Sequence, residues 1–295
     1  SDYPVSIKCG DLVSRKSHGC DVIFKVCHIE ENRDEGITAV LKGVNVRLLA
    51  DSPISDLVKV SQEEVNKDRE AFARKEKRSD KRKITKKGGR LSRQDSNIFS
   101  QPGKVLHLDG DEDYLKLCLK EYEKNGIKAF GYMYKETEQH KHIKRLINEI
   151  RPDILVVTGH DGLLKDSKDL ADINNYRNSM GFMQSVKEAR KIQPSLDELV
   201  IIAGACQSHY EAFLEAGANF ASSPDRILIH ALDPVKACIK VALAPINKIV
   251  SSEEISKVTI SGIKGIGGIE TRGKHRGGAP KPRYRLKQGG DADAV

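Results

Sequence analysis

Two reactive side chains stand at the ends of apolar runs that are typical of buried β-strands. The run ILVVTGHDG presents His160, and the run LVIIAGACQS presents Cys206, 46 residues later. That spacing accommodates a loop, a helix and a second strand parallel to the first, and the carboxyl ends of parallel strands meet at one edge of a sheet. We therefore expect the imidazole and the thiol to lie close together. A histidine in that place lowers the pKa of the thiol and later protonates a leaving amine, which predicts nucleophilic catalysis.

Neighbouring residues could complete such a site, and some of them have simpler explanations. Backbone N–H groups near Gly162 and Cys206 are candidates for an oxyanion hole. His209 follows Cys206 by three residues and is an alternative base, although its position on the next predicted helix directs it away from the strand ends. Cys206 alone would more often be a buried, inert thiol, and it is the pairing with His160 that favours catalysis.

Strands and helices alternate from Lys104 onward, and this alternation predicts the fold. Apolar β-type runs occur at 105–108, 127–132, 154–158, 199–203 and 227–230. Helical stretches lie between or after them, at 111–125, 136–150, 181–192, 209–216 and 233–242. Strands that alternate with helices of this length predict an α/β fold with a mostly parallel sheet covered by helices on both faces.

The first 60 residues have a different pattern. Short β-rich runs at 11–13, 21–26, 37–41 and 44–49 are separated by turn glycines, which favours a small five-stranded SH3-like barrel. Residues 61–100 are strongly charged, and they predict a basic flexible linker whose first half could be helical. We therefore predict four parts: an SH3-like β-barrel at 1–60, the linker at 61–100, an α/β domain at 101–270 and a basic C-terminal tail at 271–295.

The net charge of +8 is unevenly distributed. Residues 66–93 carry 13 Lys/Arg against 4 Asp/Glu, and residues 271–295 carry 7 against 2, so the rest of the chain is mildly acidic. The basic residues thus lie in two segments expected to be flexible rather than in a patterned groove. This distribution argues against nucleic-acid binding as the main function.

The remaining motifs predict no cofactor, metal or membrane span. The six cysteines form no CxxC pair and a single CxxH spacing, from Cys206 to His209, so they predict reduced thiols in a cytosolic compartment rather than a zinc site or a disulfide framework. The acidic run 109–113 lacks the ligand spacing of a calcium loop, and Asp109 is a candidate substrate contact at a strand end. The glycine-rich run 262–273 lacks the Lys-Ser/Thr of a nucleotide loop. No apolar stretch is long enough to cross a bilayer.

Two resemblances extend this prediction. An apolar strand ending in histidine, followed by one ending in Ala-Cys, resembles the caspase, legumain and gingipain group of cysteine proteases, although here Asp161 stands between His160 and Gly162. That insertion puts the role of Gly162 as an oxyanion donor in doubt. The chain as a whole resembles the YabG sporulation-specific protease family of endospore-forming bacteria, in the segments GDLVSRKSHGCDVIFKV, PGKVLHLDGDEDYL, RPDILVVTGHDG, IIAGACQSHYEA, GANFASSPDRILIHALDP and GIGGIETRG.

The family resemblance implies a function. It implies a caspase-like cysteine protease in the cytoplasm of the sporulating cell, associated with the forming spore coat, that cleaves spore coat and germination-related proteins after Arg or Lys and uses no cofactor. The alternative is a non-catalytic nucleic-acid-binding or spore-coat scaffold protein that uses the barrel and the basic segments for attachment. A salt-sensitive DNA affinity that is lost on deletion of residues 66–93 would favour that alternative.

Cleavage after a basic residue requires a carboxylate in the primary specificity pocket. Asp161, Asp225 and Asp233 lie in predicted strand-end loops and are the candidates. The same specificity would make the polar linker sequence GGRLSRQDS a substrate. We therefore expect self-cleavage within residues 86–96, after Arg93 or, as the alternative, after Arg90.

Overall fold

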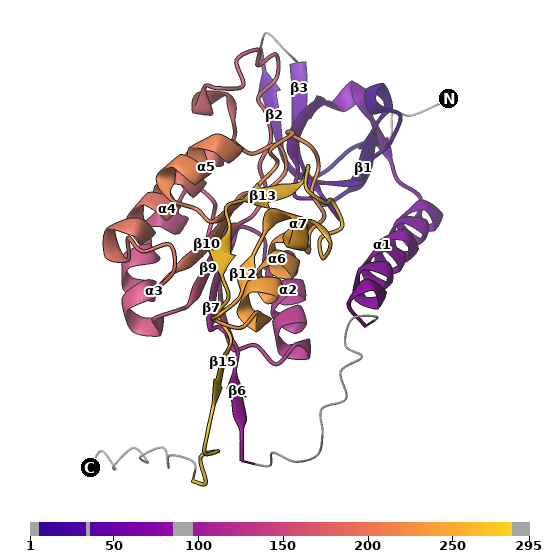
Figure 1. The fold of residues 1–295 in the computed structure, drawn as a ribbon. Coiled ribbons are helices and arrows are strands. Elements are labelled where there is room, and N and C mark those ends of the chain that lie inside the picture. Colours follow the sequence, from indigo (N-terminus) through magenta and orange to yellow (C-terminus); the bar gives the residue numbers. More distant parts are fainter. Residues whose placement is uncertain (1–5, 34–35, 85–96, 285–295) are drawn as a thin grey trace, which may run out of the picture.

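A computed structural model describes residues 6–33, 36–84 and 97–284 of the chain (Figure 1). Its centre is a six-stranded sheet in the order β13-β11-β10-β9-β7-β8. The neighbours from β8 to β11 pair in parallel, and β13, at one edge, runs antiparallel to β11. The prediction of a mostly parallel α/β sheet is confirmed.

The elements of this part follow the predicted alternation of strands and helices. The strands of the sheet are β7 (Val105–Asp109), β8 (Ala129–Met133), β9 (Ile154–Thr158), β10 (Val200–Ala203), β11 (Phe220–Ser222) and β13 (Ile266–Gly268). The helices are α2 (Glu112–Lys124), α3 (Ile143–Ile150), α4 (Ser179–Ile192), α5 (Tyr210–Ala216), α6 (Asp233–Leu243) and α7 (Ser252–Ser256). Helix α3 begins at Ile143 rather than at residue 136.

Helices cover both faces of the sheet, so consecutive strand residues are buried on opposite sides. Ile154 and Val156 of β9 pack in one apolar cluster with residues of α2, α6 and α7. Leu155 and Val157 pack in a second cluster with residues of α3, α4 and α5. This double burial explains why the strands appear in the sequence as continuous apolar runs rather than as alternating ones.

A second, antiparallel sheet, here called the N-terminal sheet, precedes α1. Its order is β4-β3-β2-β1-β5. It consists of β1 (Leu12–Arg15), β2 (Phe24–Asn32), β3 (Gly36–Gly43), β4 (Leu49–Pro53) and β5 (Leu57–Lys59). The SH3-like assignment of this sheet, the caspase-like assignment of the larger part and the division into four domains stay predictions.

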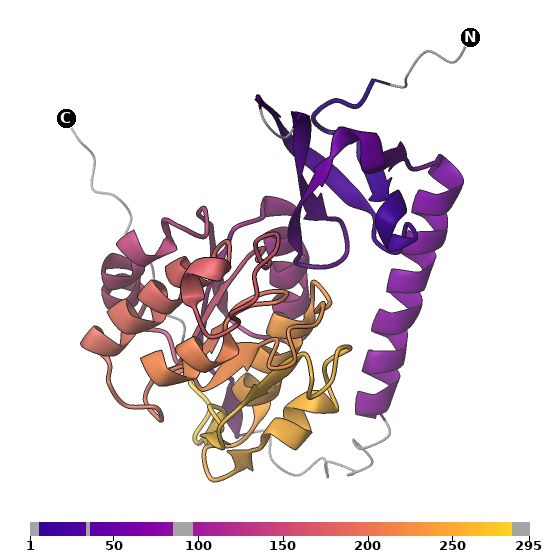
Figure 2. The ribbon, with the colours of Figure 1, turned by 90° about the horizontal axis from the view of Figure 1, so that it is seen from above.

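Helix α1 (Gln62–Ile84) follows the N-terminal sheet and runs along one side of the molecule (Figures 1 and 2). It occupies the first half of the predicted linker, while residues 85–96 lie outside the described residues. In the predicted tail, β14 (Thr271–Arg272) pairs with β12 (Ile249–Val250), and β15 (Arg276–Gly278) pairs with β6 (Phe99–Gln101), so its start is ordered by backbone pairing. None of the described helices has the length and apolar character that a membrane span requires.

Two predicted strands are wrong, and both lie near the carboxyl edge of the parallel sheet. The short β11 takes the place predicted for residues 227–230, which instead form a loop with Ile229 buried in the apolar cluster of the N-terminal sheet. Of the predicted strand 44–49, Leu49 alone belongs to a strand of the N-terminal sheet. Residues 44–48, which we call the inserted segment, connect β3 to β4 and reach the edge of the parallel sheet.

Candidate active site

Cys206 lies in the turn that follows β10, at the carboxyl edge of the parallel sheet. Gly204 permits this turn, because its φ is +110° and a Cβ there would meet the side chains of Phe213 and Ser222. The thiol is fully buried, and Sγ lies 3.1 Å from the backbone nitrogen of Ile229 and 3.6 Å from its carbonyl oxygen. Burial raises the pKa of this thiol to about 12, so Cys206 is neutral in this structure.

His160 follows β9 at the same edge. Thr158, the last residue of β9, donates a 2.8 Å hydrogen bond to the carbonyl of Gly204, which holds the ends of β9 and β10 together. The His160 ring stacks on Tyr114 of α2, with centroids 5.1 Å apart, and its Nε2 lies 3.2 Å from the carbonyl oxygen of Gly43. Burial lowers the pKa of His160 to about 4, so this imidazole is also neutral.

The inserted segment lies against both predicted catalytic residues. The carbonyl oxygen of Arg47 accepts hydrogen bonds from the backbone N–H of Cys206 at 3.2 Å and of Asp161 at 3.1 Å. Gly43, just before the segment, contacts the His160 ring as described above. The structure thus brings His160 and Cys206 to one sheet edge. Within the described residues, however, Cys206 contacts this segment, His160 contacts the Gly43 carbonyl just before it, and no hydrogen bond joins the two.

The side chain of Arg47 fills a closed pocket below that edge. Its guanidinium forms a two-pronged pair with Asp109, at 2.9 and 3.0 Å, and both side chains are fully buried. Two backbone carbonyl oxygens accept further hydrogen bonds from this side chain. Nη1 donates to Gly159 at 3.2 Å, and Nε donates to Ala231 at 2.9 Å. The Tyr114 ring covers the guanidinium, 4.8 Å from Cζ. The pocket therefore matches both the charge and the planar shape of an arginine side chain.

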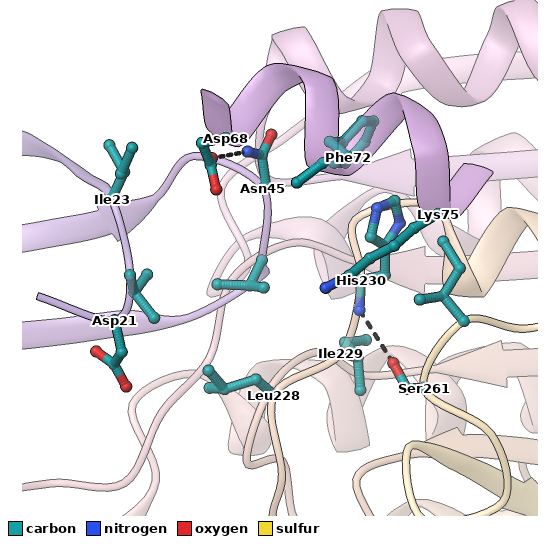
Figure 3. A pocket seen from close by; sticks show the side chains of 14 residues that line it. Asp21, Ile23, Asn45, Asp68, Phe72, Lys75, Leu228, Ile229, His230 and Ser261 are labelled. Carbon is teal, nitrogen blue, oxygen red and sulfur yellow. Dashed lines mark hydrogen bonds between the residues drawn. The ribbon is translucent and has the colours of Figure 1, made fainter. Parts of the chain in front are cut away.

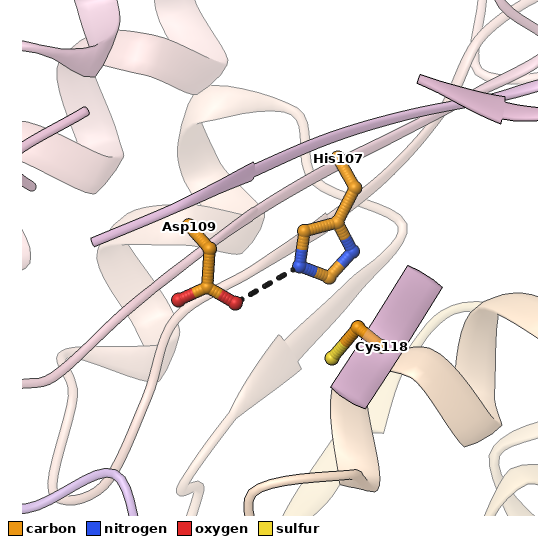
Figure 4. Close-up of side chains that lie close together, drawn as sticks. All are labelled: His107, Asp109 and Cys118. Atoms are coloured by element: carbon orange, nitrogen blue, oxygen red, sulfur yellow. Dashed lines mark hydrogen bonds and ion pairs between the residues drawn. The ribbon is translucent and has the colours of Figure 1, made fainter. Parts of the chain in front are cut away.

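The floor of this pocket is formed by β7 and α2. Nε2 of His107 lies 3.1 Å from the Asp109 carboxylate, and its Nδ1 lies 2.8 Å from the hydroxyl of Tyr122. His107, Asp109 and Cys118 lie close enough together to suggest a metal site (Figure 4). The Arg47 guanidinium, however, donates to both Asp109 and Cys118, so it already supplies the positive charge that a metal ion would bring. It also holds the pKa of Asp109 well below its usual range, against the effect of burial.

Asp161 and Gly162 have contacts that differ from those predicted for them. The Asp161 carboxylate accepts hydrogen bonds from the N–H of Gly162 at 2.8 Å and from the hydroxyls of Ser179 and Ser208 at 2.5 and 2.9 Å. It therefore ties the loop after β9 to α4 and to the turn after Cys206. The Gly162 N–H thus donates to this carboxylate. The backbone N–H that donates to the carbonyl oxygen of Arg47 is that of Asp161.

The other predicted candidates lie outside the arginine pocket. The buried Asp233 carboxylate accepts from the N–H groups of His230 and Ile260, at 3.1 and 2.7 Å, and so braces two loops. Asp225 is exposed. His209 caps α5 through Nδ1, which accepts from the backbone N–H of Ala212 at 3.2 Å, while Nε2 contacts a loop carbonyl. These contacts favour a structural role for His209.

A pocket of about 370 Å³ opens on the outer side of the inserted segment (Figure 3). Helix α1 forms one wall with Phe72 and Lys75, and the segment contributes Asn45. The Phe72 ring stacks on His230 with centroids 4.2 Å apart, and the Asn45 amide donates to the Asp68 carboxylate of α1. Helix α1 is therefore packed against both the inserted segment and the loop beside it.

Comparison with known proteins identifies the family. A family model described as YabG peptidase U57 matches residues 8–280. The chain belongs to this peptidase family. It is also 43% identical over 286 residues to a protein of Bacillus subtilis (strain 168) named Sporulation-specific protease YabG, a match that covers 94% of this chain and 99% of that protein. The predicted family resemblance is confirmed, and the protein is a protease, while the cysteine class and the site residues stay predictions.

Sequence reasoning missed the residue that defines the pocket of this peptidase. Arg47 lies in VNVRLL, whose alternating pattern predicts an ordinary strand, and no local signal separates it from the other 49 Lys and Arg residues. Tyr114 likewise carries no signal in the sequence beyond that of the helix predicted at 111–125. Asp109 was recognised as a candidate substrate contact because it ends a buried strand, and that position is the signal that could have found the pocket.

Proposed function

We propose that this protein is a cysteine endopeptidase of sporulation that cleaves peptide bonds after arginine. The observation that carries the proposal is the closed pocket at the edge that bears Cys206 and His160, which holds a guanidinium on Asp109 while the carbonyl of the same residue contacts the Cys206 N–H. Specificity and chemistry would then meet at one residue of the substrate. The name of the relative from Bacillus subtilis, a sporulation-specific protease, supports the peptidase activity and the role in sporulation.

Cys206 acts as the nucleophile in this mechanism. Its sulfur attacks the carbonyl carbon after the arginine, and the thiol proton passes to His160. The developing oxyanion is stabilised by the backbone N–H groups of Cys206 and Asp161, which already converge on one carbonyl oxygen in this structure. His160 then gives the proton to the leaving amine as the C–N bond breaks. Water hydrolyses the remaining thioester and restores the thiol.

Asp109 is the specificity residue of the proposal. A carboxylate held by two parallel hydrogen bonds selects the fork-shaped guanidinium over the compact ammonium of lysine. The carbonyls of Gly159 and Ala231 accept further hydrogen bonds from the guanidinium, and the Tyr114 ring covers it. We therefore expect arginine to be preferred over lysine before the cut, which is narrower than the Arg or Lys specificity expected from the family resemblance.

The proposed substrates are spore coat and germination-related proteins, and the proposed place of action is the cytoplasm of the sporulating cell, at the forming coat. Both are proposed from the family resemblance rather than from the site. The site itself requires no cofactor in this mechanism, because the thiol, the imidazole and two backbone N–H groups supply each step.

A peptide-library digest tests the proposed function. Wild-type protein and Cys206→Ala are incubated with the same library, and the new termini are identified by mass spectrometry. We expect cuts after arginine with the wild type and none with Cys206→Ala. Cuts made equally by both proteins, or cuts without a basic residue before them, would contradict the proposal.

Self-cleavage in the linker is a further expected outcome of this specificity. Arg93 and Arg90 lie outside the described residues, in a polar stretch between α1 and β6. Incubated wild-type protein should lose its intact band to two fragments cut after Arg93 or Arg90, whereas Cys206→Ala should stay intact. Electrophoresis and the masses of the fragments measure the result. Identical intact bands for the two proteins would show that the linker is not a substrate.

A further inference from the structure

The inserted segment is held on both sides by backbone contacts. On one side, Leu49 donates to the carbonyl of Asp161 at 2.9 Å, and Leu48 forms a parallel β-bridge with the same residue. On the other side, Ala231 donates to the carbonyl of Asn45 at 3.2 Å, next to an antiparallel bridge between Val46 and His230. Main-chain hydrogen bonds to an extended peptide are a common way for a protein to hold a peptide ligand.

Arg47 combines two contacts that have different meanings. Its guanidinium lies on Asp109, which a buried structural ion pair between two parts of the chain would also explain. Its carbonyl oxygen, however, also accepts hydrogen bonds from the backbone N–H groups of Cys206 and Asp161, the two donors that the proposed mechanism assigns to the oxyanion. A structural ion pair does not require that second placement, whereas a substrate residue before the cut requires both at once.

We propose that the inserted segment is a pseudosubstrate, which occupies the substrate cleft of its own chain with Arg47 in the position of the residue before the cut. The described structure is then the blocked state of the enzyme, and the N-terminal sheet with α1 is its inhibitory part. This inference rests on the proposed function, because that function assigns the cleft around Cys206 and Asp109.

The geometry explains why the segment stays intact while it is bound. The Cys206 sulfur is turned toward Ile229, the His160 ring faces the carbonyl of Gly43, and both side chains are fully buried. With its pKa raised to about 12, the thiol is a weak nucleophile. Both ends of the segment also continue directly into β3 and β4, so a cut would leave the new termini side by side and favour religation.

Release of the pseudosubstrate requires the N-terminal sheet and α1 to move together. Leu48 packs in one apolar cluster with Cys206, and Phe72 of α1 stacks on His230. At the rim, Arg177 donates to Asp51 of β4 at 2.5 Å. In the sequence, residues 85–96 connect α1 to β6. A cut after Arg93 would therefore leave the inhibitory part held by non-covalent contacts alone, which gives the predicted linker cleavage a function in activation.

A binding experiment tests the proposal without relying on catalysis. The probe is a fluorescein-labelled peptide with the chain's own sequence VNVRLL, and its anisotropy is measured with full-length Cys206→Ala protein. We expect weak binding to Cys206→Ala and binding tighter by roughly tenfold or more when Arg47→Ala is added, because an intramolecular competitor has been removed. Arg47→Lys, which keeps the charge but loses the fork, should give an intermediate gain.

A matched control separates the block by Arg47 from general loosening of the interface. Asp51→Asn, also in the Cys206→Ala background, removes the ion pair with Arg177 at the rim but leaves Arg47 in its pocket, so it should raise affinity far less. Circular dichroism confirms that each variant is folded, and Arg47→Lys provides the test if Arg47→Ala is not. Equal peptide affinity in Cys206→Ala and in the folded Arg47 variant would overturn the proposal.

Hydrolysis, measured with Cys206 present, distinguishes this proposal from the proposed function. Arg47→Ala should raise kcat/KM for an arginine peptide, mainly by lowering KM. If the Arg47 variants bind the peptide more tightly but neither they nor the wild type hydrolyse it, the pseudosubstrate stands and the peptidase assignment at Cys206 fails. If the wild type hydrolyses peptides and Arg47→Ala or Arg47→Lys neither binds nor cleaves them better, the pseudosubstrate fails alone.

Discussion

Replacement of Cys206 by alanine is expected to lower peptide hydrolysis by roughly 10⁴-fold or more, because a covalent mechanism has no route without its nucleophile. Initial rates on an arginine peptide measure the effect, both in the wild-type background and in Arg47→Ala, where the cleft should be open. Only small changes in stability are expected, since alanine removes one buried sulfur and its contacts with Ile229.

Two matched variants show whether the loss is specific to the proposed pair. Cys238→Ala removes another fully buried thiol, whose pKa is also raised to about 12, but on α6, beside Tyr122. It should keep activity within a few-fold of wild type. His160→Ala should lose activity nearly as completely as Cys206→Ala, whereas His209→Ala should affect mainly the cap of α5. Full activity in His160→Ala would refute the pairing.

Replacement of Asp109 by asparagine is expected to abolish the preference for arginine. The buried carboxylate pairs with a guanidinium through two hydrogen bonds, and loss of one partner of such a pair costs about 3–5 kcal/mol. For an arginine substrate, a loss of this size corresponds to a fall in kcat/KM by a factor of roughly 10² to 4 × 10³. The variant also uncouples Arg47, so the block and the specificity change together.

The specificity effect is isolated by comparing two substrates in each variant. Citrulline is the uncharged isostere of arginine. A citrulline peptide benefits equally from any release of the inserted segment, but it forms no ion pair with the carboxylate of residue 109. The ratio of kcat/KM for the arginine and citrulline peptides should collapse in Asp109→Asn and stay unchanged in Asp225→Asn, which alters an exposed carboxylate. An unchanged ratio in Asp109→Asn would place the specificity carboxylate elsewhere.

Stability measurements give an independent test of the same contact. Arg47→Ala and Asp109→Ala should each lower the free energy of unfolding, because each leaves a buried charge without its partner. The double variant should lose less than the sum of the two, since neither charge remains. Strict additivity in urea unfolding would show that the two side chains do not act as a pair.

The large sheet was predictable because its signal is local. Double burial makes β9 and β10 continuous apolar runs, and the helices between them keep their own period, so the order of elements and the shared edge of His160 and Cys206 follow from the sequence. Residues 227–230 misled the prediction, because Ile229 is buried by contact with the N-terminal sheet rather than by pairing within the large one. The short β11 carried a weaker signal than that loop.

The pocket was not predictable in the same way, because its parts come from distant positions. Arg47 lies in the inserted segment between β3 and β4, whereas Asp109 ends β7, 62 residues later. Only the docking of the N-terminal sheet brings the two side chains together. An extended segment in a cleft has the same residue pattern as an extended strand in a sheet, so VNVRLL predicts both equally well. Asp109, by contrast, ends a buried strand, and its topology alone marked it as a candidate contact.

Covalent labelling tests the central claim, that Cys206 attacks after an arginine bound on Asp109, most directly. Wild-type, Arg47→Ala and Cys206→Ala proteins are treated with an arginyl chloromethyl ketone peptide and with its citrulline analogue, and the modified cysteine is located by mass spectrometry of the digests. We predict one adduct, on Cys206, that forms faster in Arg47→Ala, more slowly with the citrulline reagent, and not at all in Cys206→Ala. An adduct confined to the exposed Cys9, Cys20 or Cys27, or equal rates with both reagents, would contradict the account.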